Sequence, residues 1–177
     1  MVDFKSPVSV KVEQFGLCLL AFFLDGSLKS SIHSFNSPTF QVSIQLLLMV
    51  FVMLELRNQS KSNYMFWYAL VLGILYDSYY SGVFGLYTIV FPLTEMIVKA
   101  IKRIIPDSLL FEWSAYFIVL TLSMIYLYFV GKFLGVTDVN FIHFIAYWLW
   151  PSLLINSIFF VILYIPLSKT SDWLMNH

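Results

Sequence analysis

The sequence predicts an all-α integral membrane protein, with six transmembrane helices packed as a compact bundle. Of its 177 residues, 60% are hydrophobic and only 11% are charged, whereas soluble domains are roughly half apolar and a quarter charged. The apolar residues also form six runs of about 17 residues or more, close to the length that crosses a bilayer. The segments between the runs are too short to fold alone, so we expect one transmembrane domain over residues 1–177.

The first three expected helices cover residues 12–28, 39–56 and 64–80. A polar, serine-rich loop follows the first run, and a charged turn ends the second. The third run closes at a turn formed by Ser81 and Gly82. Because the first run is short, re-entry of the loop at 26–38 into the membrane stays open as an alternative.

The last three expected helices cover residues 83–101, 109–133 and 141–167. The fourth contains Pro92 and ends in a basic patch, and the sixth is interrupted by Pro151. A proline removes one backbone hydrogen bond from a helix and usually bends it. We therefore expect bends in the fourth and sixth helices.

The distribution of basic residues predicts the orientation of the bundle, because cytoplasmic loops carry an excess of Lys and Arg. If the N-terminus is cytoplasmic, only Lys29 and Lys132 lie outside the cell. The cytoplasmic side then holds Lys5, Lys11, Arg57, Lys61, Lys99, Lys102, Arg103 and Lys169. This asymmetry predicts a multi-pass protein of a bacterial inner (cytoplasmic) membrane with both termini in the cytoplasm. The basic residues near the end of the fourth run would also touch anionic membrane lipid.

The stretch from Gly73 to Tyr87 carries the polar and glycine residues that depart most from the apolar background. Asp77 has no basic residue three or four positions away, and an isolated carboxylate in a membrane helix is costly. Gly73 lies one helical turn earlier and allows another helix to approach, while Gly82 and Gly85 permit a tight turn. Two interpretations stay open: Asp77 caps the fourth helix or binds turn amides, or it forms a polar node at a helix interface.

The spacing of Gly73, Asp77, Gly85, Tyr87 and Pro92 resembles the motif of MreD, the membrane subunit of the bacterial rod-shape (elongation) machinery. The resemblance implies a non-catalytic scaffold that binds the bitopic protein MreC and helps organise peptidoglycan synthesis and cell shape. It also implies contact with RodA and a class B penicillin-binding protein, directly or through MreC. The implied fold is similar to the substrate-binding S-components of energy-coupling-factor vitamin transporters. The expected interface residues are Asp25, Gly73, Asp77, Gly82, Gly85, Tyr87 and Pro92.

Two further carboxylates lie in or beside the apolar runs, and each has a lysine four positions later. Glu95 and Lys99 stand in the favourable order for an intrahelical ion pair, which predicts that Lys99 neutralises Glu95. Asp25 and Lys29 have the same spacing, but near a helix end where the helix is expected to unwind. On the predicted topology Asp25 and Asp77 lie toward the same membrane face, so they could share a site and hold a proton between them.

The sequence does not favour an enzyme, a cofactor or a nucleic-acid partner. It has no phosphate-binding glycine loop, nucleophile motif or metal-ligand spacing, and its net charge is zero. Two other functions remain open. One is the substrate-binding membrane subunit of a vitamin transporter, with a pocket lined by Asp25, Asp77 and the loop 30–36. The other is a proton-coupled transporter that uses the same two carboxylates.

Overall fold

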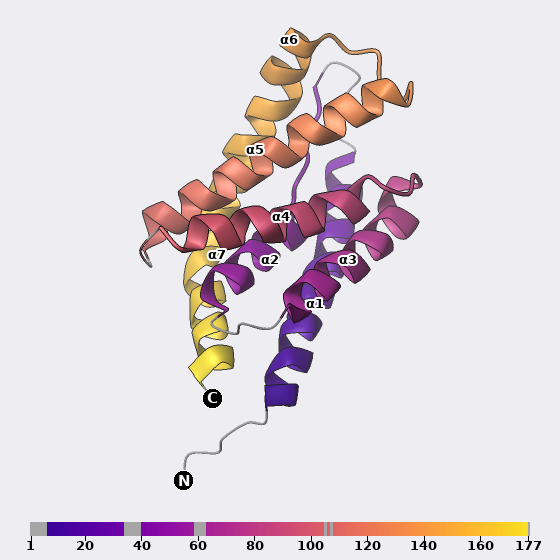
Figure 1. Ribbon diagram of the computed structural model, residues 1–177. Helices are drawn as coiled ribbons and strands as arrows, with labels where there is room; N and C mark the ends of the chain where they lie inside the picture. The colour runs from indigo at the N-terminus through magenta and orange to yellow at the C-terminus, as the bar shows by residue number, and fades with distance from the viewer. Residues whose placement is uncertain (1–6, 34–39, 59–62, 105, 107, 177) are drawn as a thin grey trace.

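The computed structural model describes residues 7–33, 40–58, 63–104, 106 and 108–176, and all regular secondary structure in these ranges is helical (Figure 1). The all-α class is therefore confirmed. The helices are α1 (Pro7–His33), α2 (Leu46–Arg57), α3 (Tyr64–Tyr76), α4 (Tyr87–Lys102), α5 (Leu109–Phe133), α6 (Phe141–Phe144) and α7 (Trp150–Asn176). There are also two π-helical turns. The first, η1 (Asp77–Ser81), continues α3, and the second, η2 (Ile145–Leu149), joins α6 to α7.

Two segments among the described residues are long and apolar enough to cross a membrane. They are α5 and the continuous helix at Phe141–Thr170. Of the sequence-based boundaries, 109–133 coincides with α5, whereas the helical segment expected at 141–167 continues to Asn176.

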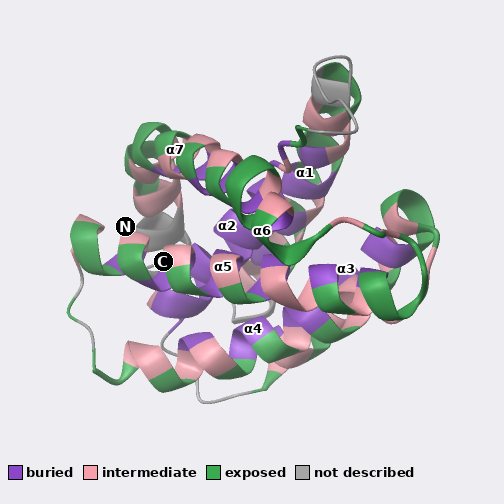
Figure 2. Ribbon diagram, turned by 90° about the horizontal axis from the view of Figure 1, so that it is seen from above, coloured by how far each residue is buried: buried purple, intermediate pink, exposed green. Residues whose placement is uncertain are grey.

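The shortest of the main helices, α2, forms the centre of the bundle (Figure 2). Every residue from Leu46 to Leu56 is buried, and α2 packs against α1, α4, α5 and α7. With 12 residues, α2 is about 18 Å long at 1.5 Å per residue, well short of a hydrocarbon core about 30 Å thick. It is a half-length helix enclosed by protein.

The expectation of one helix over 39–56 is wrong, because residues 40–45 are not helical. This segment alternates apolar Phe40, Val42 and Ile44 with polar Gln41, Ser43 and Gln45, the pattern of an extended chain. Six extended residues cover about 20 Å. Together with α2 they are long enough to cross a bilayer. The run therefore has the expected reach, but its helical part begins only at Leu46.

Other boundaries differ around the polar residues. α1 stays helical through Asp25 and Lys29 as far as His33, so the expected unwinding at Asp25 is wrong. Residues 26–33 of the loop proposed to re-enter the membrane are part of α1, and residues 34–38 lie outside the described ranges. The fourth helix begins at Tyr87 rather than at 83. The residues before it form a turn in which Gly82 and Gly85 adopt positive φ angles of 69° and 101°.

Polar contacts link the helix ends where α2 and α4 finish and where α5 begins. Arg57 forms an ion pair with Glu112 at 2.8 Å. The Lys102 ammonium donates to the carbonyl of Glu55 at 2.9 Å. Lys99 forms an ion pair with Glu95, which confirms the predicted neutralisation of Glu95. The start of α1 and the end of α7 lie at this same end of the bundle (Figure 1).

Candidate functional site

The carboxylate of Asp77 caps the N-terminus of α4. Its Oδ2 atom accepts hydrogen bonds from the N–H of Gly85 at 2.9 Å, and from the N–H and hydroxyl of Thr88 at 3.0 and 2.8 Å. Its Oδ1 atom accepts from the N–H of Tyr87 at 2.8 Å. The first N–H groups of a helix have no partner within the helix, and Asp77 supplies one. Of the two interpretations, the capping of the fourth helix is the one observed.

Gly73 brings α3 against the start of α4 next to this cap. A Cβ atom at Gly73 would lie 2.6 Å from both the Thr88 Cα and the Tyr87 carbonyl oxygen. Only a residue without a side chain therefore lets the amides of α4 reach Asp77. Gly85 contributes in another way, because its φ of 101° is one that other residues rarely adopt.

Asp25 plays the same part for α2. Its Oδ1 atom accepts the N–H of Leu46, the first residue of α2, at 3.0 Å. Its Oδ2 atom accepts the hydroxyl of Tyr76 at 2.7 Å, and the Lys29 ammonium in turn donates to that hydroxyl. The carboxylate is fully buried, and it is connected to Lys29 through Tyr76.

The two aspartates do not form the shared site that the topology suggested. The hydrogen bonds of Asp25 go to Leu46 and Tyr76, whereas those of Asp77 go to the turn before α4 and to its first residues. Each carboxylate is held by donors, so neither is arranged to share a proton with the other.

The remaining expected interface residues lie on or near the α3–α4 joint. Tyr87 belongs to the cap through its N–H, and its hydroxyl accepts from Gln45 Nε2 at 3.1 Å. Gly82 ends η1 with a left-handed φ and is exposed. Pro92 lies half-buried within α4, beyond the capped first turn. Gly73, Asp77, Gly85 and Tyr87 thus come together, and Asp25 lies in the separate joint between α1 and α2.

Side chains of α7 form hydrogen bonds with the backbone of the extended segment at 40–45. Asn156 accepts the N–H of Gln45 at 2.9 Å through Oδ1 and donates to the Ser43 carbonyl at 2.7 Å through Nδ2. The hydroxyl of Ser152 accepts the N–H of Ser43 at 2.9 Å. Non-helical backbone within a bilayer needs such partners, because lipid offers none.

Pro151 also contributes to holding this segment. It has no N–H to donate to the carbonyl of Tyr147, four residues earlier. That carbonyl instead accepts the N–H of Gln41 at 3.2 Å. The interruption expected from Pro151 therefore frees an acceptor for the extended segment.

We expect Asn156→Leu to lower the free energy of unfolding by about 2 kcal/mol, because a buried N–H and a buried carbonyl lose their partner. SDS-induced unfolding in mixed micelles measures this change. Ser114→Ala is the control, since Ser114 is exposed and its hydroxyl donates only to its own helix. Equal stability of the two variants would contradict the role given to Asn156.

A cavity of about 540 Å³ lies beside these joints, within the usual size range of ligand sites. Its polar lining includes Lys29, Gln41, Ser43, Gln45, Tyr76, Tyr80, Tyr87, Tyr128, Thr137 and Trp148, and its apolar lining includes Val83, Leu86, Met124, Leu127 and Phe144. Asp25 and Asp77, proposed from the sequence to line a pocket, are not among the lining residues. Instead, Asp25 and Asp77 bind the first residues of α2 and α4, next to the residues that line the cavity.

Sequence reasoning missed the polar groups of this cavity. The alternation at 40–45 was the available signal, since Gln41, Ser43 and Gln45 all line the cavity from one side of the extended chain. Tyr76 and Trp148 gave no comparable signal, because aromatic residues are common throughout the apolar runs.

The fold and these joints define a helical membrane protein whose buried polar side chains hold helix ends and one extended segment in place. The arrangement can position backbone and enclose a cavity; among the described residues, no group of three or more His, Cys, Asp or Glu side chains is placed to hold a metal ion. The chain belongs to the MreD family: the family model of the rod shape-determining protein MreD matches residues 11–171. This is a family of shape-determining membrane proteins. No curated protein and no solved structure matches the chain.

Proposed function

We propose that this protein is a non-catalytic scaffold of the elongation machinery that binds MreC and helps organise peptidoglycan synthesis. It would cross the bacterial inner membrane six times as one domain, with both termini in the cytoplasm. RodA and a class B penicillin-binding protein would join directly or through MreC, and the cytoplasmic basic residues would contact anionic lipid. Family membership supports the role in rod-shape determination.

The observation that best supports the scaffold function is that the two aspartates expected in the membrane, Asp25 and Asp77, cap helix ends. Both oxygens of Asp25 and of Asp77 accept hydrogen bonds that hold helix ends. A transporter that carries protons needs carboxylates that gain and lose a proton during its cycle. Carboxylates committed to capping favour a rigid scaffold instead.

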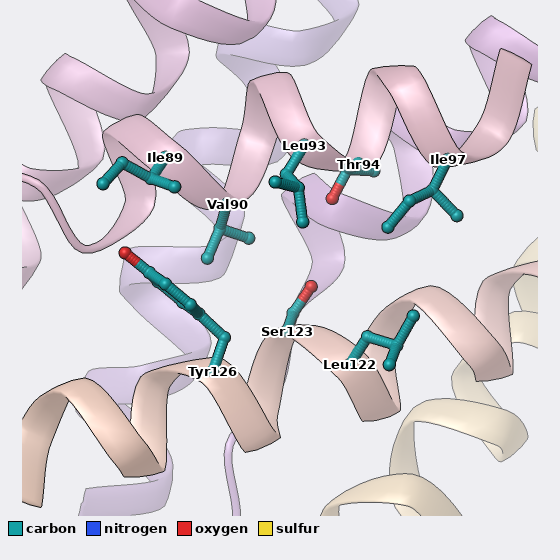
Figure 3. Close-up of a pocket in the computed structure, with 8 residues that line it drawn as sticks. All are labelled: Ile89, Val90, Leu93, Thr94, Ile97, Leu122, Ser123 and Tyr126. Atoms are coloured by element: carbon teal, nitrogen blue, oxygen red, sulfur yellow. The ribbon is translucent and has the colours of Figure 1, made fainter.

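The exposed face of α4 is the surface that we propose for lateral packing of the MreC membrane helix. Ile89, Leu93 and Met96 are 48%, 48% and 62% exposed and follow helical spacing along α4. Ile89 and Leu93 also line a small hollow of about 20 Å³ together with Leu122 and Tyr126 of α5 (Figure 3). An exposed apolar stripe along a helix suits another helix packing against it.

We expect Leu93→Trp to reduce recovery of MreC with the tagged protein about tenfold, a loss of about 1.4 kcal/mol of binding free energy. The indole is bulkier than the leucine side chain and would prevent close packing of another helix against α4. The measurement is co-purification in mild detergent, with membrane insertion checked in parallel. Ile158→Trp is the control, because Ile158 is 59% exposed but lies on α7. Full MreC recovery by Leu93→Trp would contradict the α4 assignment.

A second candidate function, binding of a small molecule as in the S-components of vitamin transporters, is supported by the cavity between α1, the extended segment before α2, the α3–α4 joint, α5 and α6. Its volume of about 540 Å³ and its several polar groups meet the requirement for such a site. The same purification tests it: a co-purifying ATPase pair or stoichiometric vitamin would favour the transporter, and MreC without them would favour the scaffold.

A further inference from the structure

The cavity presents hydrogen-bond donors to whatever occupies it. The Lys29 ammonium carries three N–H donors, and one is used by the Tyr76 hydroxyl. It lies 4.4 Å from the centre of the Tyr76 ring and 5.6 Å from that of Tyr87. An occupant with acceptor atoms would accept from the two ammonium N–H groups that remain.

The carboxylate nearest to Lys29 in sequence, Asp25, is held by other hydrogen-bond donors. Asp25 accepts from the first N–H of α2, at the positive end of the helix dipole, and it is not part of the cavity lining. Tyr76 stands between the carboxylate and the ammonium through its two hydrogen bonds. Lys29 is the charged residue of the lining, so the cavity presents a cation while Asp25 stabilises α2.

The rest of the lining is largely aromatic and aliphatic. The Tyr76 and Tyr87 rings are tilted against each other with their centres 4.1 Å apart, and the Tyr128 and Phe144 rings stack at 4.3 Å. All four line the cavity. Such walls favour an apolar or aromatic body, while Lys29 favours an anionic group.

We propose that this cavity binds an amphiphilic anion, with a phosphate or carboxylate group at Lys29 and an apolar body between the aromatic side chains. The anion comes either from a membrane lipid headgroup or from a soluble phosphate or carboxylate compound. The proposal does not rest on MreC binding. An empty cavity would leave the scaffold function standing, and failure to recover MreC would leave the ligand measurement unchanged.

The test uses the purified full-length protein in dodecyl maltoside and three probes. Oleoyl lysophosphatidic acid represents the lipid source, phenyl phosphate represents the soluble source, and 1-oleoylglycerol is the uncharged counterpart of the first. We expect at least one anionic probe to raise the unfolding temperature in a saturable manner, with no shift from oleoylglycerol. Lys29→Gln is expected to weaken the binding at least tenfold.

Two further variants make the test specific. Lys169→Gln removes an exposed lysine of α7 that does not line the cavity, and binding should stay unchanged. Gly131→Leu fills the cavity without altering Lys29, because a Cβ atom at Gly131 would meet only Thr137, at 3.6 Å; binding should be lost. This second variant decides the question if Lys29→Gln fails to fold.

The probe that binds more tightly identifies the source of the anion. Equal affinity of the wild-type protein and Lys29→Gln would overturn the proposal. So would an equal loss in Lys169→Gln, undiminished binding by Gly131→Leu, equal binding of oleoylglycerol, or no saturable shift with either anionic probe.

Discussion

Replacement of Asp77 by alanine is expected to lower the free energy of unfolding by about 4 kcal/mol, the largest effect among the substitutions considered. The change leaves three backbone N–H groups and the Thr88 hydroxyl without their acceptor. These donors lie at the start of α4, where water cannot easily replace the lost carboxylate. SDS-induced unfolding in mixed micelles measures the change, and Ser78→Ala is the matched control, since Ser78 is exposed and donates only to its own helix.

Asp77→Asn separates capping from proton chemistry. An asparagine keeps one oxygen, which can take the place of Oδ2 and its three hydrogen bonds. The capping role therefore predicts a loss of stability between those of the wild-type protein and Asp77→Ala. A proton-coupled role predicts instead that Asp77→Asn keeps full stability while it abolishes function completely; that pattern would contradict capping as the reason for the aspartate.

Gly73→Ala is expected to lower the free energy of unfolding by about 3 kcal/mol, at the upper end of the usual cost of overpacking. The added methyl group would lie 2.6 Å from backbone atoms of Tyr87 and Thr88, and a backbone cannot rotate away as a side chain can. The start of α4 must then move, and the capping hydrogen bonds of Asp77 lengthen. The same unfolding measurement applies.

Gly16→Ala is the matched control for Gly73→Ala. Gly16 is also helical, and a methyl group added there would have nothing within 4 Å outside its own helix and chain neighbours. Alanine is a better helix former than glycine by up to about 1 kcal/mol, so Gly16→Ala should be neutral or stabilising. A similar destabilisation by both variants would show that the close approach of α3 and α4 is not the cause.

The sequence predicted the helices best where a run is uniformly apolar, as in α5. Its prediction for residues 39–56 failed because hydropathy measures depth in the membrane and not backbone conformation. Val42, Ile44 and Gln45 are buried, yet the segment is extended, and Ser152 and Asn156 on α7 accept the backbone N–H groups of Ser43 and Gln45. That contact joins distant parts of the chain, and no local pattern contains it.

The candidate site was predictable in part for the same reason. The sequence singled out Asp77 and Gly73 because a carboxylate and a glycine one turn apart are unusual in an apolar helix, and in the structure Asp77 accepts from the first amides of α4 while Gly73 lies against them. It offered capping as one role for Asp77, and it placed Asp25 near the same end. It did not find that Tyr76 and Leu46 are the partners of Asp25, because these partners depend on how α1, α2 and α3 pack.

The extended segment before α2 constrains the order in which the protein is assembled during synthesis. Its partners Ser152 and Asn156 lie 109 and 111 positions after Ser43 and Gln45, so most of the chain must leave the ribosome first. Until then the N–H groups of Ser43 and Gln45 lack the acceptors that replace water, and lipid cannot supply them. These two groups therefore stay hydrated until α7 has been made, and α7 completes the insertion of the extended segment together with α2.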